Sequence, residues 1–242
     1  MGLKIEQLRY EADGLSMLGH LAWDDALDQP RPAVLVFPEA FGLGEHAKER
    51  AERLATEFGF VALACDLHGN GETIESLDEV MPLITPLRTS SDKVRDRVCR
   101  PLEVLAVRPE VDAGRMAAIG FCFGGTMSYE LALAGADIKA AIGFHSGLEV
   151  TSPQDSGQIK GKIMALIGAD DPGITSEQRA AFETMLRTGG VDWQMHLYGG
   201  VVHSFTSPEA DLRGMPDFLR YDAVADDRSW KHMALLLNEV FQ

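Results

Sequence analysis

Short apolar runs alternate with longer amphipathic stretches along this chain. Strand-length runs with few polar residues occupy 32–37, 60–65, 138–144 and 162–167. Such runs are typical of strands that are buried on both faces. Helical periodicity follows two of these runs, over 45–58 and 176–188. Alternating strands and helices imply right-handed crossovers, so the pattern predicts an α/β fold with a mostly parallel central sheet and helices on both faces.

Less regular patterns complete the predicted elements. Two apolar patterns within 3–23 flank the turn Ala12-Asp13-Gly14 and predict an N-terminal hairpin. Residues 193–198 are predicted as a last strand and 229–241 as a closing helix. No linker divides the pattern, so we expect a single domain over 1–242.

The stretch from about 76 to 107 is predicted to be mostly helical. Because proline lacks an N–H and clashes with the preceding turn, we expect interruptions at Pro82, Pro86 and Pro101.

The most informative motif is Gly120-Phe121-Cys122-Phe123-Gly124. It follows the apolar run 116–119 and precedes a helical pattern over 126–134. A residue between two glycines at a strand-to-helix turn sits on a sharp bend, and its side chain projects above the sheet edge. This arrangement is a nucleophile elbow, usually built around serine and here around Cys122.

Two further polar groups follow predicted strands. Asp171, in Gly168-Ala169-Asp170-Asp171-Pro172, comes after the strand over 162–167, and His203 comes after the strand over 193–198. The carboxyl ends of parallel strands meet at one edge of the sheet. The chain order nucleophile, acid, histidine is the order that α/β-hydrolases use.

The three residue types suit one kind of catalysis. A free thiol has a pKa of about 8.5 and is mostly protonated at neutral pH, whereas the thiolate is the nucleophile. An imidazole such as His203 can take the thiol proton, and a carboxylate such as Asp171 can hold that imidazole in the right tautomer. Non-catalytic interpretations stay open for these residues. Cys122 is also explained as a small buried residue, and Asp171 as an ordinary polar residue of a loop. Asp170 is an alternative candidate for the acid.

The sequence resembles the dienelactone hydrolase family of α/β-hydrolases over nearly its whole length. The matching segments are Pro38-Glu39-Ala40-Phe41-Gly42, Asp66-Leu67-His68-Gly69, the elbow 120–125, the Gly168-to-Asp171 turn and His203-Ser204-Phe205. The resemblance implies that Glu39 contacts the resting thiol and helps to generate the thiolate. It also implies an oxyanion hole formed by the backbone N–H groups of Ala40 and Phe123.

The sequence departs from the family's pattern at the residues that bind the carboxylate group of the substrate. The type enzyme uses two arginines, one of them at the position of Ser207 here; Arg88, Arg95 and Arg97 lie in the segment that supplies the other, without a convincing alignment. A guanidinium is the natural partner of a carboxylate. The absence of a matching arginine therefore puts dienelactone itself in doubt as the substrate. His145 and Ser146 are candidates for the pocket lining, and the polar insertion 208–227 is either a lid or a surface loop.

The composition excludes some classes of binding partner. A net charge of −15 makes binding to nucleic acid or to an anionic membrane surface unfavourable. No apolar run approaches the roughly 18 residues of a membrane span, and residues 1–6 lack the apolar core of a signal peptide. Three cysteines without metal spacing fit a reducing, cytoplasmic compartment. No cofactor and no metal are implied, and the protein is expected to be a monomer or a small homo-oligomer.

Together these features predict a hydrolase of a small ester or lactone that works through an acyl-Cys122 intermediate. His203 would act as base and then acid, Asp171 would orient it, and Glu39 would tune the thiol. Two alternatives remain: a non-catalytic binding protein with this fold, and an acyltransferase using the same triad.

Overall fold

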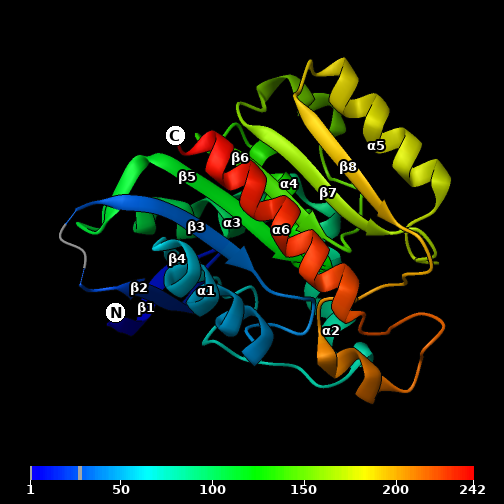
Figure 1. Ribbon diagram of the computed structural model, residues 1–242, viewed down its shortest axis with the longest axis horizontal. Helices are drawn as coiled ribbons and strands as arrows, with labels where there is room; N and C mark the ends of the chain where they lie inside the picture. The colour runs from blue at the N-terminus through cyan, green and yellow to red at the C-terminus, as the bar shows by residue number, and fades with distance from the viewer. Residues whose placement is uncertain (1, 27–28) are drawn as a thin grey trace.

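The computed structural model describes residues 2–26 and 29–242, and its described strands form one sheet with helices on both faces (Figure 1). The order across the sheet is β1-β2-β4-β3-β5-β6-β7-β8. The strands are β1 (Leu3–Ala12), β2 (Leu15–Asp24), β3 (Arg31–Phe37), β4 (Val61–Ala64), β5 (Val111–Phe121), β6 (Ala140–Phe144), β7 (Lys162–Gly168) and β8 (Trp193–Tyr198).

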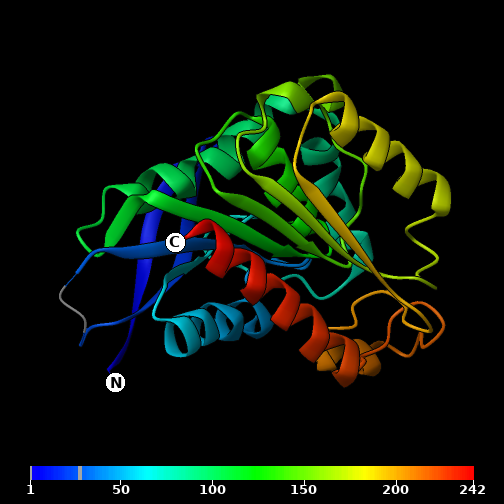
Figure 2. The same ribbon diagram turned by 45° about the horizontal axis from the view of Figure 1, so that its top comes forward.

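The helices are α1 (Glu45–Phe58), α2 (Leu77–Thr89), α3 (Ser91–Ala106), α4 (Phe123–Leu133), α5 (Ser176–Thr188) and α6 (Ala223–Val240), with 3-10 turns η1 (Pro153–Gln158) and η2 (Pro208–Arg213). Figure 2 shows α1 and α6 below the sheet and α3, α4 and α5 above it. Within the described part of the chain, no helix is both long and apolar enough to cross a membrane.

The strand directions confirm the predicted mostly parallel sheet. The N-terminal hairpin β1–β2 is antiparallel and pairs with β4 through a second antiparallel contact. From β4 to β8 every neighbouring pair is parallel. The carboxyl ends of six strands therefore lie along one edge, which is where an open α/β sheet places its ligand site.

The apolar runs are buried as expected because both faces of the sheet are covered. In β3, Ala33, Leu35 and Phe37 pack into the core beneath α3 and α4, whereas Val34 and Val36 pack into the core beneath α1 and α6. This alternation follows from the two-residue period of a strand. The two cores therefore lie on opposite faces of the sheet.

The expected interruptions at the three prolines are wrong. Pro82 and Pro86 lie inside α2 and Pro101 lies inside α3, while the break between the helices falls at Ser90. Ser90 ends α2, and its side chain caps α3 by accepting the N–H of Lys93. Pro82 is exposed at the surface, so the carbonyl it leaves unpaired faces water and the helix continues.

The closing helix begins earlier than predicted. α6 starts at Ala223, because Asp222 accepts hydrogen bonds from the backbone N–H groups of Val224 and Ala225 and caps the helix. The predicted insertion over 208–227 therefore consists of η2, irregular chain from Gly214 to Asp222, and the first turn of α6. In Figure 1 the orange part of this segment lies beside the carboxyl ends of the strands.

The passage from β5 to α4 is tightly packed against neighbouring backbone. A Cβ at Gly120 would lie 2.0 Å from the carbonyl oxygen of Gly124, and one at Gly124 would lie 2.2 Å from that of Phe37. Only glycine permits such approaches. The fold therefore requires glycine at both positions of the elbow motif, because a larger residue would overlap neighbouring backbone.

Replacing Gly120 by alanine should destabilise the protein by about 3 kcal/mol, because the methyl group would overlap backbone that cannot move aside. Thermal or urea unfolding measures the effect. Gly114→Ala in the same strand is the control, since its nearest neighbour would be the movable side chain of Asp112 at 3.2 Å. Equal stability of the two variants would contradict the steric argument.

Candidate active site

The elbow places Cys122 in a strained conformation between β5 and α4. Its φ is +53° with ψ at −120°, a combination that a residue with a Cβ seldom adopts. The backbone N–H of Cys122 donates to the carbonyl of Phe144 at 2.9 Å, which ties the bend to the end of β6. Cys122 itself is half-buried at the sheet edge.

The predicted acid and histidine reach the same point from the next strands. The Sγ of Cys122 lies 3.1 Å from Nε2 of His203, and Nδ1 of His203 lies 2.7 Å from Oδ2 of Asp171. Asp171 is buried and also accepts the N–H of Gly173. Asp170, the competing acid, is exposed and lies outside this chain of contacts.

The surroundings of His203 favour its protonated form. Burial disfavours the imidazolium of His203, but the charge of Cys122 and the hydrogen bonds to Asp171 and Cys122 outweigh it and raise the pKa of His203 to about 10. An imidazolium beside the sulfur stabilises the thiolate, which is the nucleophilic form.

The two residues expected to form the oxyanion hole, Ala40 and Phe123, line cavities that Cys122 also lines. Phe123 is the first residue of α4, whose first-turn amides have no acceptor within the helix and carry its positive dipole end. Ala40 follows β3 in the turn closed by the N–H of Gly42 and the carbonyl of Glu39. The carbonyl of Ala40 is held by Nε2 of His68 at 2.7 Å, a role for His68 that its loop position did not reveal.

Glu39 lies in the wall of the same cavity as Cys122. Burial raises the pKa of its carboxyl group, and its Oε1 atom has no hydrogen-bond partner among the described residues. The structure pairs the thiol with His203, so the implied contact between Glu39 and the thiol is not among the hydrogen bonds of the described chain.

Cys122 opens onto two cavities, of about 140 and 270 Å³. Residues that line both are Ala40, Leu77, Cys122, His203 and Phe218. The smaller cavity is mostly apolar and extends towards η2; the larger is bounded by α2, α4 and the loop that precedes α5. The thiol thus borders open space in both cavities.

The insertion after His203 forms much of the smaller cavity. Phe218 stacks on the His203 ring, and its carbonyl accepts the N–H of His203. Phe218 and Leu219 are apolar residues of the insertion 208–227, and their contact with His203 depends on how the segment folds back. The segment therefore forms a wall of the site.

Two arginines line the cavities, Arg213 and Arg88, and neither has a convincing alignment with the family's arginines in the sequence. Ser207 lines the smaller cavity at the place where an arginine is absent, and Arg213 lines it too, with its guanidinium 3.7 Å from the ring centroid of Phe41. Arg88 borders the larger cavity, where it lies 3.6 Å from Glu149. The sequence pattern did not single out Arg213.

The expectation that His145 and Ser146 line the pocket is wrong. Both are fully buried, and neither borders the two cavities next to Cys122. A Cβ on Gly125 would lie 1.6 Å from Oγ of Ser146, which shows how closely these residues pack beneath the elbow. Within the described ranges, no group of three or more histidine, cysteine or acidic side chains is arranged to hold a metal ion.

Comparison with solved structures gives the same fold. A structure named m3DLH superposes with a TM-score of 0.96 and 42% identity over the whole of both chains. The dienelactone hydrolase-like promiscuous phosphotriesterase P91 from metagenomic libraries has a TM-score of 0.94 and 40% identity, again over the whole of both chains. These likenesses confirm the predicted α/β-hydrolase fold.

Sequence relatives point to the same group. A probable 2-oxo-3-(5-oxofuran-2-ylidene)propanoate lactonase of Bradyrhizobium sp. is 29% identical over 85% of this chain and 83% of its own length. A putative carboxymethylenebutenolidase of Escherichia coli is 26% identical over 92% of this chain and 82% of its own. The model of the dienelactone hydrolase family matches residues 19–241. From Gly19 in the hairpin to Phe241 after the last helix, the chain thus belongs to the dienelactone hydrolase family.

Proposed function

We propose that this protein hydrolyses a small ester or lactone through a thioester formed on Cys122. The observation that carries the proposal is the unbroken line of contacts from Asp171 through His203 to the Cys122 sulfur, which borders two cavities. Membership in a family of hydrolases supports the reaction class.

Acylation would begin at the thiolate. The sulfur of Cys122 attacks the carbonyl carbon, and the carbonyl oxygen becomes an oxyanion that the N–H groups of Ala40 and Phe123 would stabilise. The tetrahedral intermediate collapses with cleavage of the C–O bond. His203 gives its proton to the departing alkoxide, and the acyl group remains on Cys122.

Deacylation would reverse the roles. His203 takes a proton from water, the hydroxide attacks the thioester carbonyl, and the C–S bond breaks to release a carboxylic acid. With a lactone, alcohol and acid remain in one molecule, so the product is a hydroxy acid. Throughout, Asp171 holds Nδ1–H of His203 and stabilises the imidazolium, which loses its proton in acylation and forms again in deacylation.

Glu39 is proposed to tune the thiol. Its carboxyl lies in the same cavity wall, and its burial favours the neutral acid. A neutral carboxyl adds no negative charge next to the developing thiolate. Its unpartnered oxygen is also free to accept a hydrogen bond when substrate rearranges the site.

The names of relatives suggest substrates to test. Two of them are described as a lactonase and a carboxymethylenebutenolidase, which favours lactones. The P91 neighbour is described as a promiscuous phosphotriesterase, so an aryl phosphotriester belongs in the same panel. A binding protein would turn over none of these compounds, and an acyltransferase would need an added acceptor alcohol or amine.

Cys122→Ala should reduce turnover of aryl esters and lactones by at least about 1,000-fold, because no other group can form the acyl intermediate. Steady-state hydrolysis measures this, and thermal unfolding verifies that the variant folds. Cys99→Ala is the matched control: that thiol is half-buried, burial raises its pKa, and it lies outside the site. Activity retained by Cys122→Ala would rule out the proposed nucleophile.

Asp171→Asn should lower kcat by about 100-fold to 10,000-fold, because the amide no longer stabilises the imidazolium or fixes its tautomer. The pKa of His203 should fall in this variant, so the onset of Cys122 alkylation by iodoacetamide should move to higher pH. Asp170→Asn changes the neighbouring exposed carboxylate and should leave both measurements unchanged. Equal losses in the two variants would contradict the assignment of the acid.

A further inference from the structure

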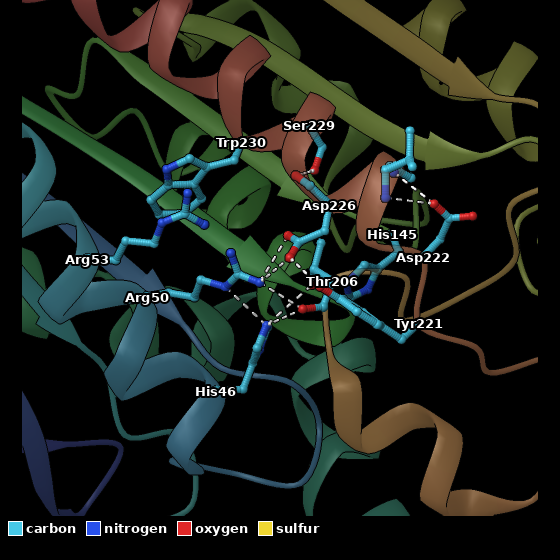
Figure 3. A network of polar contacts seen from close by, with 12 residues as sticks. His46, Arg50, Arg53, His145, Thr206, Tyr221, Asp222, Asp226, Ser229 and Trp230 are labelled. Atoms are coloured by element: carbon cyan, nitrogen blue, oxygen red, sulfur yellow. Dashed lines mark hydrogen bonds and ion pairs between the residues drawn. The ribbon is translucent and has the colours of Figure 1, made fainter.

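A buried polar chain lies beneath the nucleophile and outside both cavities (Figure 3). At its centre is His145, the residue that follows β6. Nδ1 of His145 lies 3.2 Å from the backbone nitrogen of Cys122, and Nε2 lies 2.8 Å from Oγ1 of Thr206. The two ring nitrogens thus join the elbow of Cys122 to the turn that follows His203.

The hydrogen-bond directions define one tautomer of His145. The backbone N–H of Cys122 can only donate, and it is shared between the Phe144 carbonyl and Nδ1 of His145, so Nδ1 is an acceptor without hydrogen. Nε2 then carries the hydrogen and donates to Oγ1 of Thr206. Burial, followed by the nearby His203, lowers the pKa of His145, which keeps the ring neutral.

Thr206 is anchored at the far end of the chain. Its carbonyl accepts a hydrogen bond of 2.7 Å from Nη2 of Arg50 on α1. The same nitrogen contacts both carboxylate oxygens of Asp226 on α6, at 3.0 and 2.9 Å. Because Arg50 and Asp226 are both buried, this ion pair is hard to displace. Thr206 is therefore fixed to the two helices that cover one face of the sheet.

Three residues in or next to this chain of hydrogen bonds have strained backbone conformations. The φ angles of Cys122, His145 and Ser204 are +53°, +40° and +55°. Each such conformation costs about 1–3 kcal/mol and persists only where surrounding contacts hold it. Ser204 begins the tight turn that its carbonyl closes with the N–H of Ser207, and Thr206 lies within that turn. The hydrogen bonds of His145 therefore connect the strained elbow at Cys122 to the turn that begins at the strained Ser204.

We propose that His145 is a positioning residue that sets the distance between the Cys122 sulfur and His203. It holds the elbow against the turn after His203 through one acceptor and one donor, with Thr206 as the fixed end. A phenylalanine, like the neighbouring Phe144 and Phe205, would fill the same kind of space but supply neither contact. The inference rests on the proposed function, in which that distance governs proton transfer.

Thr206→Val and Thr206→Ser form the matched test. Valine keeps the shape of threonine and removes the acceptor for His145, whereas serine keeps the hydroxyl. Since small displacements of reacting groups can cost up to about 100-fold in rate, kcat of the valine variant should fall by about 10-fold to 100-fold. KM should change little, because neither Thr206 nor His145 borders the cavities. The serine variant should retain the kcat of the wild type.

A second measurement is independent of turnover. Nitrogen-15 NMR of the histidine rings distinguishes the Nε2–H tautomer from Nδ1–H and from imidazolium. At neutral pH the wild type should show His145 neutral with hydrogen on Nε2. In Thr206→Val the Nε2–H signal should lose its hydrogen-bonded shift, while in Thr206→Ser it should remain.

Three results would overturn the inference: wild-type kcat in Thr206→Val, equal loss of kcat in the valine and serine variants, or an Nδ1–H ring in the wild type. The first result overturns it even if the melting temperature of Thr206→Val falls, because a loss of stability alone indicates a structural role only. Cys122→Ala, assayed alongside, separates this from the proposed function. If that variant is inactive while Thr206→Val is normal, only the role of His145 fails.

Discussion

The close approach of backbone at the start of α4 is the constraint on which the rest of the site depends. Gly120 and Gly124 allow carbonyl groups to lie where any Cβ would overlap them. The chain can then reverse within one residue, and Cys122 takes the strained φ of +53°. A wider turn would carry the sulfur away from His203, and the first amide of α4 away from the position proposed for an oxyanion.

The parallel sheet turns this local strain into a site. Because β5, β7 and β8 run in the same direction, the segments after them meet at one edge, and Cys122, Asp171 and His203 come within hydrogen-bond reach although 81 residues separate the first from the last. The two apolar cores on either side of the sheet fix the strand ends. Rigid strands thus supply the geometry, and loops supply the chemistry.

Sequence patterns identified the elements whose cause is local. Uninterrupted apolar runs marked β3 and β7, and the 3.6-residue period gave α1 and α5 with their observed ends. Spacing also anticipated that Cys122, Asp171 and His203 would meet, because strand ends converge in any parallel sheet. Pattern alone failed at Ser90 and at Asp222, where single side-chain caps decide where helices begin and prolines do not.

Contacts between segments that lie far apart in the chain could not be predicted from the sequence pattern. The sequence left open whether the insertion 208–227 is a lid or a surface loop, and nothing near Arg213 or Phe218 indicates that these side chains line the cavity. Likewise, His145 was expected in the pocket lining, whereas its burial beneath the elbow follows from the path of β6 between β5 and β7. Such placements depend on tertiary packing, which local pattern does not encode.

Mass spectrometry of the enzyme quenched during turnover of a slow aryl ester tests the central claim most directly. The account predicts a peptide containing Cys122 that is heavier by the mass of the acyl group minus one hydrogen, formed in the first turnover and lost as substrate is exhausted. Hydrolysis that proceeds with an acyl group on another residue, or with unmodified Cys122 under conditions where deacylation is slow, would contradict it.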